Sequence, residues 1–346
     1  MGIKITTWNI EHAQNLISQN PTQTTVNRRQ RVRQTIEQID PDILCMQEGP
    51  KGEQAVTDFS AQVLENRWAP VMLRRPGEPL GLRDREYQIK GNQWIWFLVR
   101  AGLEPRGELQ PPAIWQAFNG MKNWPVNLWG EEKAVSHGHY RHPQVLSFDL
   151  GRDKKLELIG VHLKSKINQK PIVRDMEGNL VGDYVDEALQ ARIQLATEAR
   201  NVRQYIAARF EQLAHPAIVV LGDCNDGPGH DFFETLYLYF DLISNLQGDV
   251  MLAERFFNHA LFDYPARLRW TAKYRDEVLG VPASQNPLLL DHILISQPLC
   301  RGELPVVAHA HAGQVEHEAF AMGNAGSTSA TRTSDHRPVS CQLDDN

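Results

Sequence analysis

The order of apolar and polar positions along the chain predicts many strands separated by a few helices. Residues 3–9 alternate as a half-buried strand does, and residues 43–47 form a short apolar run typical of a buried strand. Residues 26–39 and 186–210 repeat apolar side chains at helical spacing, and Pro41 helps to end the first of these helices. Further strands are predicted over residues 94–103, 143–150, 156–163, 217–223, 288–296 and 337–343. Strands therefore dominate the chain.

Two segments interrupt this pattern. Residues 104–139 are rich in proline, glycine and tryptophan, and residues 301–333 end in a run of small polar side chains. Neither segment has the apolar periodicity of an independent domain, so we predict one domain over residues 1–346 with irregular insertions at about 104–139 and 301–333. The tryptophans of the first insertion either stack on the bases of a single strand or cover a sheet edge. They are Trp115, Trp124 and Trp129.

The composition is that of an ordinary soluble globular protein, with 42% hydrophobic and 23% charged residues. The formal net charge is -6, which argues mildly against general attraction to polyanions but is compatible with a local basic rim around an acidic metal site. The chain opens with a strand pattern and lacks a run of about 18 apolar residues, so we expect a cytoplasmic protein that does not enter a membrane. The cysteines have no CxxC spacing, which favours a reducing compartment. They are Cys45, Cys224, Cys300 and Cys341.

Polar side chains able to bind a cation or a phosphate stand at the ends of these strands. If the strands lie together, their ends meet at one rim and the side chains converge there. Carboxylate and amide oxygens suit a hard cation such as Mg²⁺ or Mn²⁺, and histidines beside them can face a phosphate. The positions are Asn9, Glu48, His162, Asp223, Asn225, Asp291, Asp335 and His336.

The sharpest local motif is LGDCND, in which Asp223 and Asn225 follow an apolar strand. There the carboxylate can accept a proton from water while the amide orients that water. The alternative is a β-turn in which both side chains bind their own backbone. The motif SDHRPV leaves a similar choice, between a catalytic pair of Asp335 and His336 and a solvated loop before a final strand.

His162 is followed by two lysines, an arrangement that suits a phosphodiester. His162 can donate a proton or a hydrogen bond while Lys164 and Lys166 hold non-bridging oxygens, and Arg141 is a further candidate for substrate binding. The alternative is a structural histidine beside solvated lysines. Four arginines of the helix over 26–39 either contact a nucleic-acid backbone or form a solvated face. They are Arg28, Arg29, Arg31 and Arg33.

The motifs carry more weight together than singly. The ordered series TWN, QE, VHLKSK, GDCND, LDHILIS and SDHRPV resembles, over nearly the whole chain, the motif set of the endonuclease/exonuclease/phosphatase superfamily. This resemblance implies an α/β fold, a four-layer α/β sandwich of two stacked mixed β-sheets flanked by helices. It also implies an active site at one edge, between the sheets.

The resemblance also implies roles for the candidate residues. Glu48 becomes the principal ligand of Mg²⁺ or Mn²⁺, with Asn9 and Asp335 in or next to the coordination shell. Asp223 and Asn225 position and activate the attacking water.

Two histidines complete the implied site. His162 and His336 hydrogen-bond the scissile phosphate and help the leaving oxygen to depart, while Asp291 orients His336. The run VHLKSK resembles bacterial nucleases, so the expected function is a metal-dependent phosphodiesterase acting on nucleic acid, most simply a DNA endonuclease or nickase. Two alternatives remain at this stage. One is a phosphatase or phosphodiesterase acting on a small-molecule or lipid head group, and the other is a binding module without activity.

Overall fold

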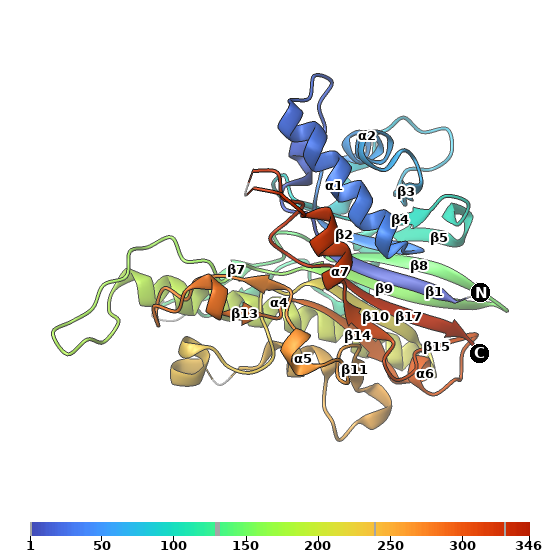
Figure 1. The fold of residues 1–346 in the computed structure, drawn as a ribbon. Coiled ribbons are helices and arrows are strands. Elements are labelled where there is room, and N and C mark those ends of the chain that lie inside the picture. The colour runs from blue at the N-terminus through green and yellow to red at the C-terminus, as the bar shows by residue number, and fades with distance from the viewer. Residues whose placement is uncertain (1, 129–131, 239, 329) are drawn as a thin grey trace.

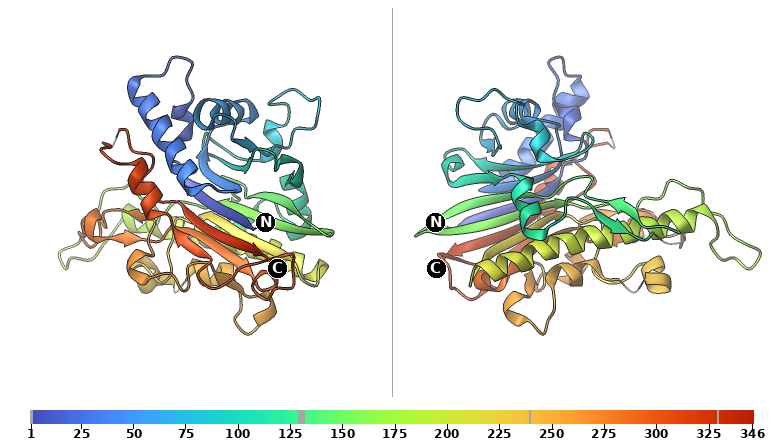
Figure 2. Two further views of the ribbon diagram at one scale, coloured as in Figure 1. Left: turned by 45° about the vertical axis from the view of Figure 1, so that its right-hand side comes forward. Right: turned by 180° about the vertical axis from the view of Figure 1, so that it is seen from behind.

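Two large mixed β-sheets packed face to face form the centre of the molecule, with helices on both outer faces (Figure 1). The computed structural model describes residues 2–128, 132–238, 240–328 and 330–346. Helices α1, α2 and α7 cover the first sheet, and α3, α4 and α5 cover the second, as the turned views in Figure 2 also show. The four-layer α/β sandwich predicted from the ordered motifs is confirmed.

The first sheet has both chain ends among its central strands. Within the described residues its strand order is β15 (Val306–Val307), β17 (Val339–Asp345), β1 (Ile3–Asn9), β2 (Ile43–Gly49), β4 (Trp94–Arg100) and β3 (Trp68–Pro70), and β16 (Gly313–Val315) also pairs with β17. The pairing of β1 with β2 is parallel, whereas β17 runs antiparallel to β1.

The second sheet is built around the strand that ends at Asp223. Over the described ranges its order is β11 (Phe257–His259), β14 (Asp291–Ser296), β10 (Ala217–Asp223), β9 (Lys154–His162), β8 (Gln144–Gly151) and β5 (Gly107–Gln110). Strand β10 is parallel to β9 and antiparallel to β14. Two small ribbons lie outside the large sheets. They pair β6 (Trp124–Val126) with β7 (Val135–His137), and β12 (Ala272–Lys273) with β13 (Pro287–Leu288).

The helices begin and end close to where the apolar periodicity places them. The side chain of Thr22 caps α1 by accepting a hydrogen bond from the backbone N–H of Thr25, and Asp40 ends this helix in a left-handed conformation. The helices are α1 (Gln23–Ile39), α2 (Glu53–Leu64), α3 (Pro112–Asn119), α4 (Asp183–Gln212), α5 (Leu242–Gln247), α6 (Gln297–Cys300) and α7 (His317–Gly323). Among the described residues, no helix is both long and apolar enough to cross a membrane.

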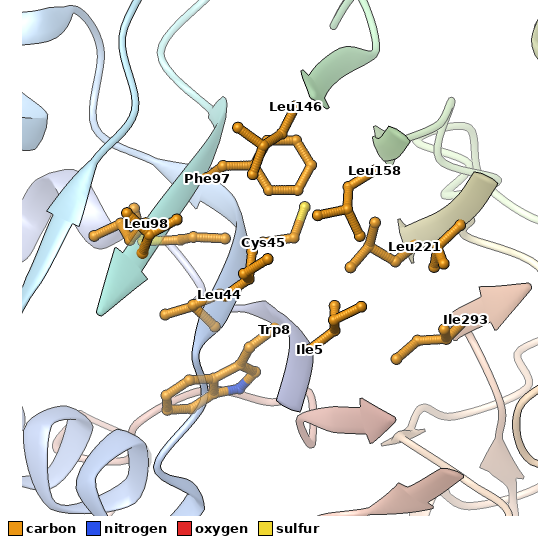
Figure 3. Close-up of a cluster of buried hydrophobic side chains, with 14 of the residues drawn as sticks. Ile5, Trp8, Leu44, Cys45, Phe97, Leu98, Leu146, Leu158, Leu221 and Ile293 are labelled. Carbon is orange, nitrogen blue, oxygen red and sulfur yellow. The ribbon is translucent and has the colours of Figure 1, made fainter. Parts of the chain in front are cut away.

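An apolar layer between the sheets holds them together (Figure 3). Ile5 and Phe97 of the first sheet and Leu158, Leu221 and Ile293 of the second belong to one buried cluster, and each is fully buried. Burying such side chains stabilises the fold by about 1.5–3 kcal/mol each. This layer fixes how the edges of the two sheets face one another.

The two segments expected to be irregular contain more regular structure than predicted. Residues 104–139 contribute β5 to the edge of the second sheet, followed by α3 and the β6–β7 ribbon, and residues 301–333 contain β15, β16 and α7. These elements are short, and their apolar residues contact distant parts of the chain, so no local periodicity reveals them. The strand expected over 288–296 also differs, since it is broken before Asp291.

Candidate active site

Strand β10 brings three candidate residues together through its register. Asp223, the last residue of β10, lies opposite His162 of β9 in the parallel pair and opposite Asp291 of β14 in the antiparallel pair. Asp223 is 1% exposed, and its Oδ2 lies 3.6 Å from Nε2 of His162. Because β14 is antiparallel to β10, Asp291 reaches this edge at the start of its strand, and not at the end as the sequence suggested.

The first sheet supplies the opposite side of the site. Asn9 ends β1, and its Nδ2 donates to Oδ2 of Asp223 at 3.0 Å and lies 3.5 Å from Oε1 of Glu48. Oε2 of Glu48 accepts a hydrogen bond from the backbone N–H of His12. The Asn9 side chain therefore crosses from one sheet to the other, and the site lies at their shared edge.

The loop before β17 brings the last pair of candidates to the same edge. Nε1 of Trp8 donates to the carbonyl oxygen of His336 at 2.9 Å, and Oγ of Ser334 donates to the carbonyl oxygen of Asn9 at 2.6 Å. Nδ1 of His336 lies 2.7 Å from Oδ2 of Asp291, as the resemblance implied for this pair. All three contacts fix the loop to the strands that carry the other site residues.

Tyr274 is a member of this cluster that sequence reasoning missed. Its hydroxyl donates to Oδ2 of Asp335 at 3.0 Å and lies 2.9 Å from Nε2 of His336. Burial and the nearby charge of Asp335 raise the pKa of Tyr274, so the phenol stays protonated. No local motif marks this residue, because it follows the short strand β12 in a loop.

Two site residues have backbone conformations that residues other than glycine rarely adopt. The φ angle is +54° at Glu48 and +53° at Asn225. At Asn225 this conformation lets its own N–H donate to Oδ1 of Asp223 at 2.8 Å while Nδ2 donates to the carbonyl oxygen of Leu163 at 3.0 Å. Such conformations persist where the surrounding contacts enforce them, and they gather at functional sites.

The charges of the site are set by burial and by neighbours. Although burial opposes its charged form, the carboxylates of Asp291 and Asp223 raise the pKa of His336 to about 10. Burial, together with the charges of Arg141 and His336, lowers the pKa of His162 well below its ordinary value. His336 is therefore cationic near neutral pH, whereas His162 is neutral.

Asp223 has the pKa of a group that can exchange protons near neutrality. Burial raises its pKa to about 6, although the charge of His336 and the hydrogen bond from Asn9 oppose this shift. Each oxygen of Asp223 accepts one hydrogen bond within the site, and a carboxylate oxygen has a second lone pair for a water proton.

The donor set fits a hard divalent cation. Glu48 offers carboxylate oxygens beside the Asn9 amide, and Asp335 offers a further carboxylate next to His336 in the chain. Oxygen ligands of this kind are those that Mg²⁺ and Mn²⁺ prefer. Asp223, Asp291 and His336 also lie within 4.8 Å of one another. Both nitrogens of His336 already have partners, however, which argues against this histidine as a metal ligand.

The three cations expected to bind substrate have different surroundings. Arg141 and Lys164 line one cavity beside His162. Nζ of Lys166 instead lies 2.8 Å from Glu234 and 3.0 Å from Asp231, and it also pairs with Asp226. These carboxylates neutralise Lys166, which leaves Arg141 and Lys164 as the cations that can attract a substrate.

The remaining candidates are held by contacts within the protein. Trp115 is buried and stacks on Tyr205 with ring centroids 4.0 Å apart, and Trp124 packs edge-on against His137. Trp129 lies outside the described residues. The arginines of α1 also have internal partners, which are carbonyl oxygens for the first three and a carboxylate for the last. They are Arg28, Arg29, Arg31 and Arg33.

Comparison with known proteins supports the architecture. No family model matches the chain, and no curated protein matches it. Truncated TDP2 from Caenorhabditis elegans has a similar structure, with 13% identity, a TM-score of 0.52, and coverage of 99% of this chain and 98% of that chain. A second structure of TDP2 from C. elegans gives 12% identity and a TM-score of 0.51, with coverage of 99% and 75%.

A third similar structure is the endonuclease/exonuclease/phosphatase from Bacteroides vulgatus, with 12% identity, a TM-score of 0.46 and full coverage of both chains. The similarity to TDP2 shows that the chain shares its fold, the four-layer α/β sandwich predicted from the ordered motifs.

Proposed function

We propose that this chain is a divalent-metal-dependent phosphodiesterase that hydrolyses nucleic acid, with DNA cleaved internally as by an endonuclease or nickase. The observation that carries the proposal is the Asn9 side chain, which joins Glu48 of one sheet to Asp223 of the other. Around it lie a neutral histidine, a cationic histidine and a further carboxylate, Asp335. These are the groups that hydrolysis of a phosphodiester requires.

Asp223 acts on the attacking water. Its carboxylate takes a proton from the water as the new oxygen–phosphorus bond forms, and its pKa of about 6 leaves it ionised at neutral pH. The N–H of Asn225 holds one carboxylate oxygen in place, and the Asn9 amide holds the other. The base is therefore oriented from both sheets.

The two histidines act on the phosphate and on the leaving group. Neutral His162 donates a hydrogen bond to a non-bridging oxygen. Cationic His336 stabilises the charge that develops in the transition state, and it gives a proton to the alkoxide released when the second oxygen–phosphorus bond breaks. Asp291 keeps His336 charged and oriented through the bond at Nδ1.

Glu48, Asp335 and Asn9 would hold the cation, either Mg²⁺ or Mn²⁺. When bound, the cation supplies Lewis-acid stabilisation of the phosphoryl oxygens. Arg141 lies close enough to Asp223 for their charges to interact. Together with Lys164, which lines the same cavity, it favours an anionic substrate at this edge.

A substrate panel tests the proposal. Purified protein is incubated with supercoiled plasmid, linear and single-stranded DNA, RNA, bis-p-nitrophenyl phosphate and phosphomonoesters, with Mg²⁺, Mn²⁺ or EDTA. We expect metal-dependent nicking of the plasmid and hydrolysis of the diester, both lost in Asp223→Asn. Turnover of phosphomonoesters or of lipid head groups in preference to DNA would instead establish the small-substrate alternative.

A further inference from the structure

A cavity of about 540 Å³ lies directly beside the candidate active site. Three parts of its wall are the segment at Lys90, the segment from the β6–β7 ribbon to Arg141, and the segment at Lys164 that follows β9. Gln194 and Glu198 of α4 line it as well, and β7 lies beside α4 in Figure 1.

The cavity and the catalytic edge share one backbone group. The carbonyl oxygen of Leu163 accepts a hydrogen bond from Nδ2 of Asn225 at 3.0 Å, and Nη1 of Arg141 lies 3.5 Å from the same oxygen. Leu163 directly follows His162, which is expected to contact the scissile phosphate. The cavity therefore begins next to His162, and a substrate bound at His162 can extend into it.

The cavity has an excess of positive charge. Lys90, Arg141 and Lys164 line it, and among the described residues the ammonium of Lys90 has no hydrogen-bond or ion-pair partner. Nε of Arg141 is also buried without a partner in the described part of the chain. Lys90 is therefore available to an anionic ligand, whereas Nζ of Lys164 already donates to the carbonyl oxygen of Ser165 at 2.8 Å and keeps its other N–H groups for a ligand.

Glu198, the one carboxylate among the described residues of the cavity wall, already has other partners. Glu198 lies 3.2 Å from Nε2 of His137 and accepts a hydrogen bond from the backbone N–H of Lys164 at 2.9 Å. Although burial opposes it, the imidazoles of His137 and His139 lower the pKa of Glu198 to about 2. Glu198 therefore stays ionised, and its charge acts on Arg141 and Lys164, two of the three cations of the wall.

An exposed aromatic ring stands at the mouth of the cavity. Tyr140 is 47% exposed, and its carbonyl oxygen accepts a hydrogen bond from the N–H of Lys90 at 2.8 Å, which joins two of the walls. The guanidinium of Arg141 lies 5.8 Å from the centre of the Tyr140 ring. A ring held beside cations can stack a base while the cations bind the backbone of a single strand.

We infer that this cavity binds the nucleotide next to the scissile phosphate of a single-stranded or locally unpaired substrate. Tyr140 stacks on its base, while Lys90 and Lys164 contact its phosphate. This inference rests on the proposed function and adds to it a preference for substrates that extend beyond the cleaved bond. It makes Lys90 and Tyr140 specificity-determining residues.

Binding is measured without turnover, so that the test does not depend on catalysis. The dissociation constant of a fluorescein-labelled single-stranded pentanucleotide is determined by anisotropy in the Asp223→Asn background, alone and with Lys90→Gln or Tyr140→Ala. The matched control is Lys155→Gln, because Lys155 is exposed at the opposite end of β9. Circular dichroism shows whether each variant is folded.

We expect Tyr140→Ala to raise the dissociation constant about tenfold, the effect of losing one stacked base. Lys90→Gln should raise it and reduce the slope of its logarithm against the logarithm of salt concentration by about 0.7, the value for one phosphate contact on a single strand. Lys155→Gln should change neither quantity.

The outcomes separate this inference from the proposed function. If wild type cleaves phosphodiesters but Lys90→Gln and Tyr140→Ala both bind the pentanucleotide as the background protein does, the cavity has another role and the inference is overturned. If both substitutions weaken binding while the wild type hydrolyses no phosphodiester with any metal, the cavity is a single-strand binding site and the proposed function fails.

Discussion

The phenol of Tyr274 lies 2.9 Å from Nε2 of His336, the atom expected to meet the substrate. The same hydroxyl donates to Asp335, so it couples the orientation of a proposed metal ligand to that of a proposed proton donor. Because Nδ1 of His336 is bonded to Asp291, the imidazole is held from both sides.

Replacing Tyr274 by phenylalanine removes the hydroxyl and keeps the ring. We expect kcat/KM for bis-p-nitrophenyl phosphate to fall about tenfold, corresponding to the loss of one hydrogen bond to a charged group, with little change in Tm. The value of kcat/KM should fall further in Tyr274→Leu. Wild-type kinetics in Tyr274→Phe would mean that the contact has no part in positioning His336.

Asp223→Asn tests the proposed base. We expect kcat to fall at least a hundredfold, since general-base catalysis contributes about 10²–10⁴. The substitution also removes a buried charge, so Tm should equal or exceed that of the wild type, as for other residues whose environment serves activity at the expense of stability. Full activity in this variant, measured with plasmid and with the small diester, would contradict the assigned role.

Metal binding should be detectable from thermal stability as well as from activity. Mg²⁺ or Mn²⁺ should raise Tm, because an ion that binds the native state at about 100 times its dissociation constant stabilises it by about 2.7 kcal/mol. EDTA should abolish the shift and the activity. Glu48→Gln should require at least about tenfold more metal for the same shift, whereas Glu108→Gln, an exposed control, should not.

Lys166 provides a prediction about stability. Its ammonium offsets the charges of Asp226, Asp231 and Glu234, so Lys166→Met should lower the free energy of unfolding by about 3 kcal/mol. Lys170→Met is the matched control, because Lys170 is half exposed and 3.8 Å from an exposed carboxylate. Urea unfolding measures both. An equal loss in the two variants would show that the buried cluster contributes no special stability.

His142 makes stability depend on pH. Burial lowers its pKa from 6.5 to about 3, and its Nδ1 donates to the carbonyl oxygen of Pro143 at 2.7 Å. Since its pKa is depressed in the folded state, the stability it contributes is complete above pH 6.5 and is lost as pH falls toward 3. Between pH 7 and pH 5 the wild type should lose about 2 kcal/mol more than His142→Gln. Parallel unfolding curves for the two proteins over this range would contradict the prediction.

The strands that carry the site could be predicted from sequence because their patterns are local. Strands β1 and β10 have the predicted bounds, and both end at a polar residue of the site. The strand over 288–296 was predicted too long, because Leu289 and Leu290 are apolar but lie before β14. Apolar runs show burial and do not show where the ladder of hydrogen bonds begins.

Contacts between distant segments could not be predicted in this way. Lys166 stands near His162 in the sequence, yet its partners follow it by 60 to 68 residues. Tyr274 reaches His336 across 62 residues, with no motif around it. The ordered motifs identified the fold, but these electrostatic neighbours follow only from packing.

The reach of Asn9 from β1 to Asp223 of β10 has a consequence for the apolar layer in Figure 3. The reacting groups lie on two different sheets, and buried side chains such as Ile5 and Leu221, which do not contact the substrate, determine the distance between these sheets. A small shift of one sheet relative to the other would misalign the base with the phosphate while the protein remained folded. The interior of this molecule therefore acts as the spacer that keeps its chemistry in alignment.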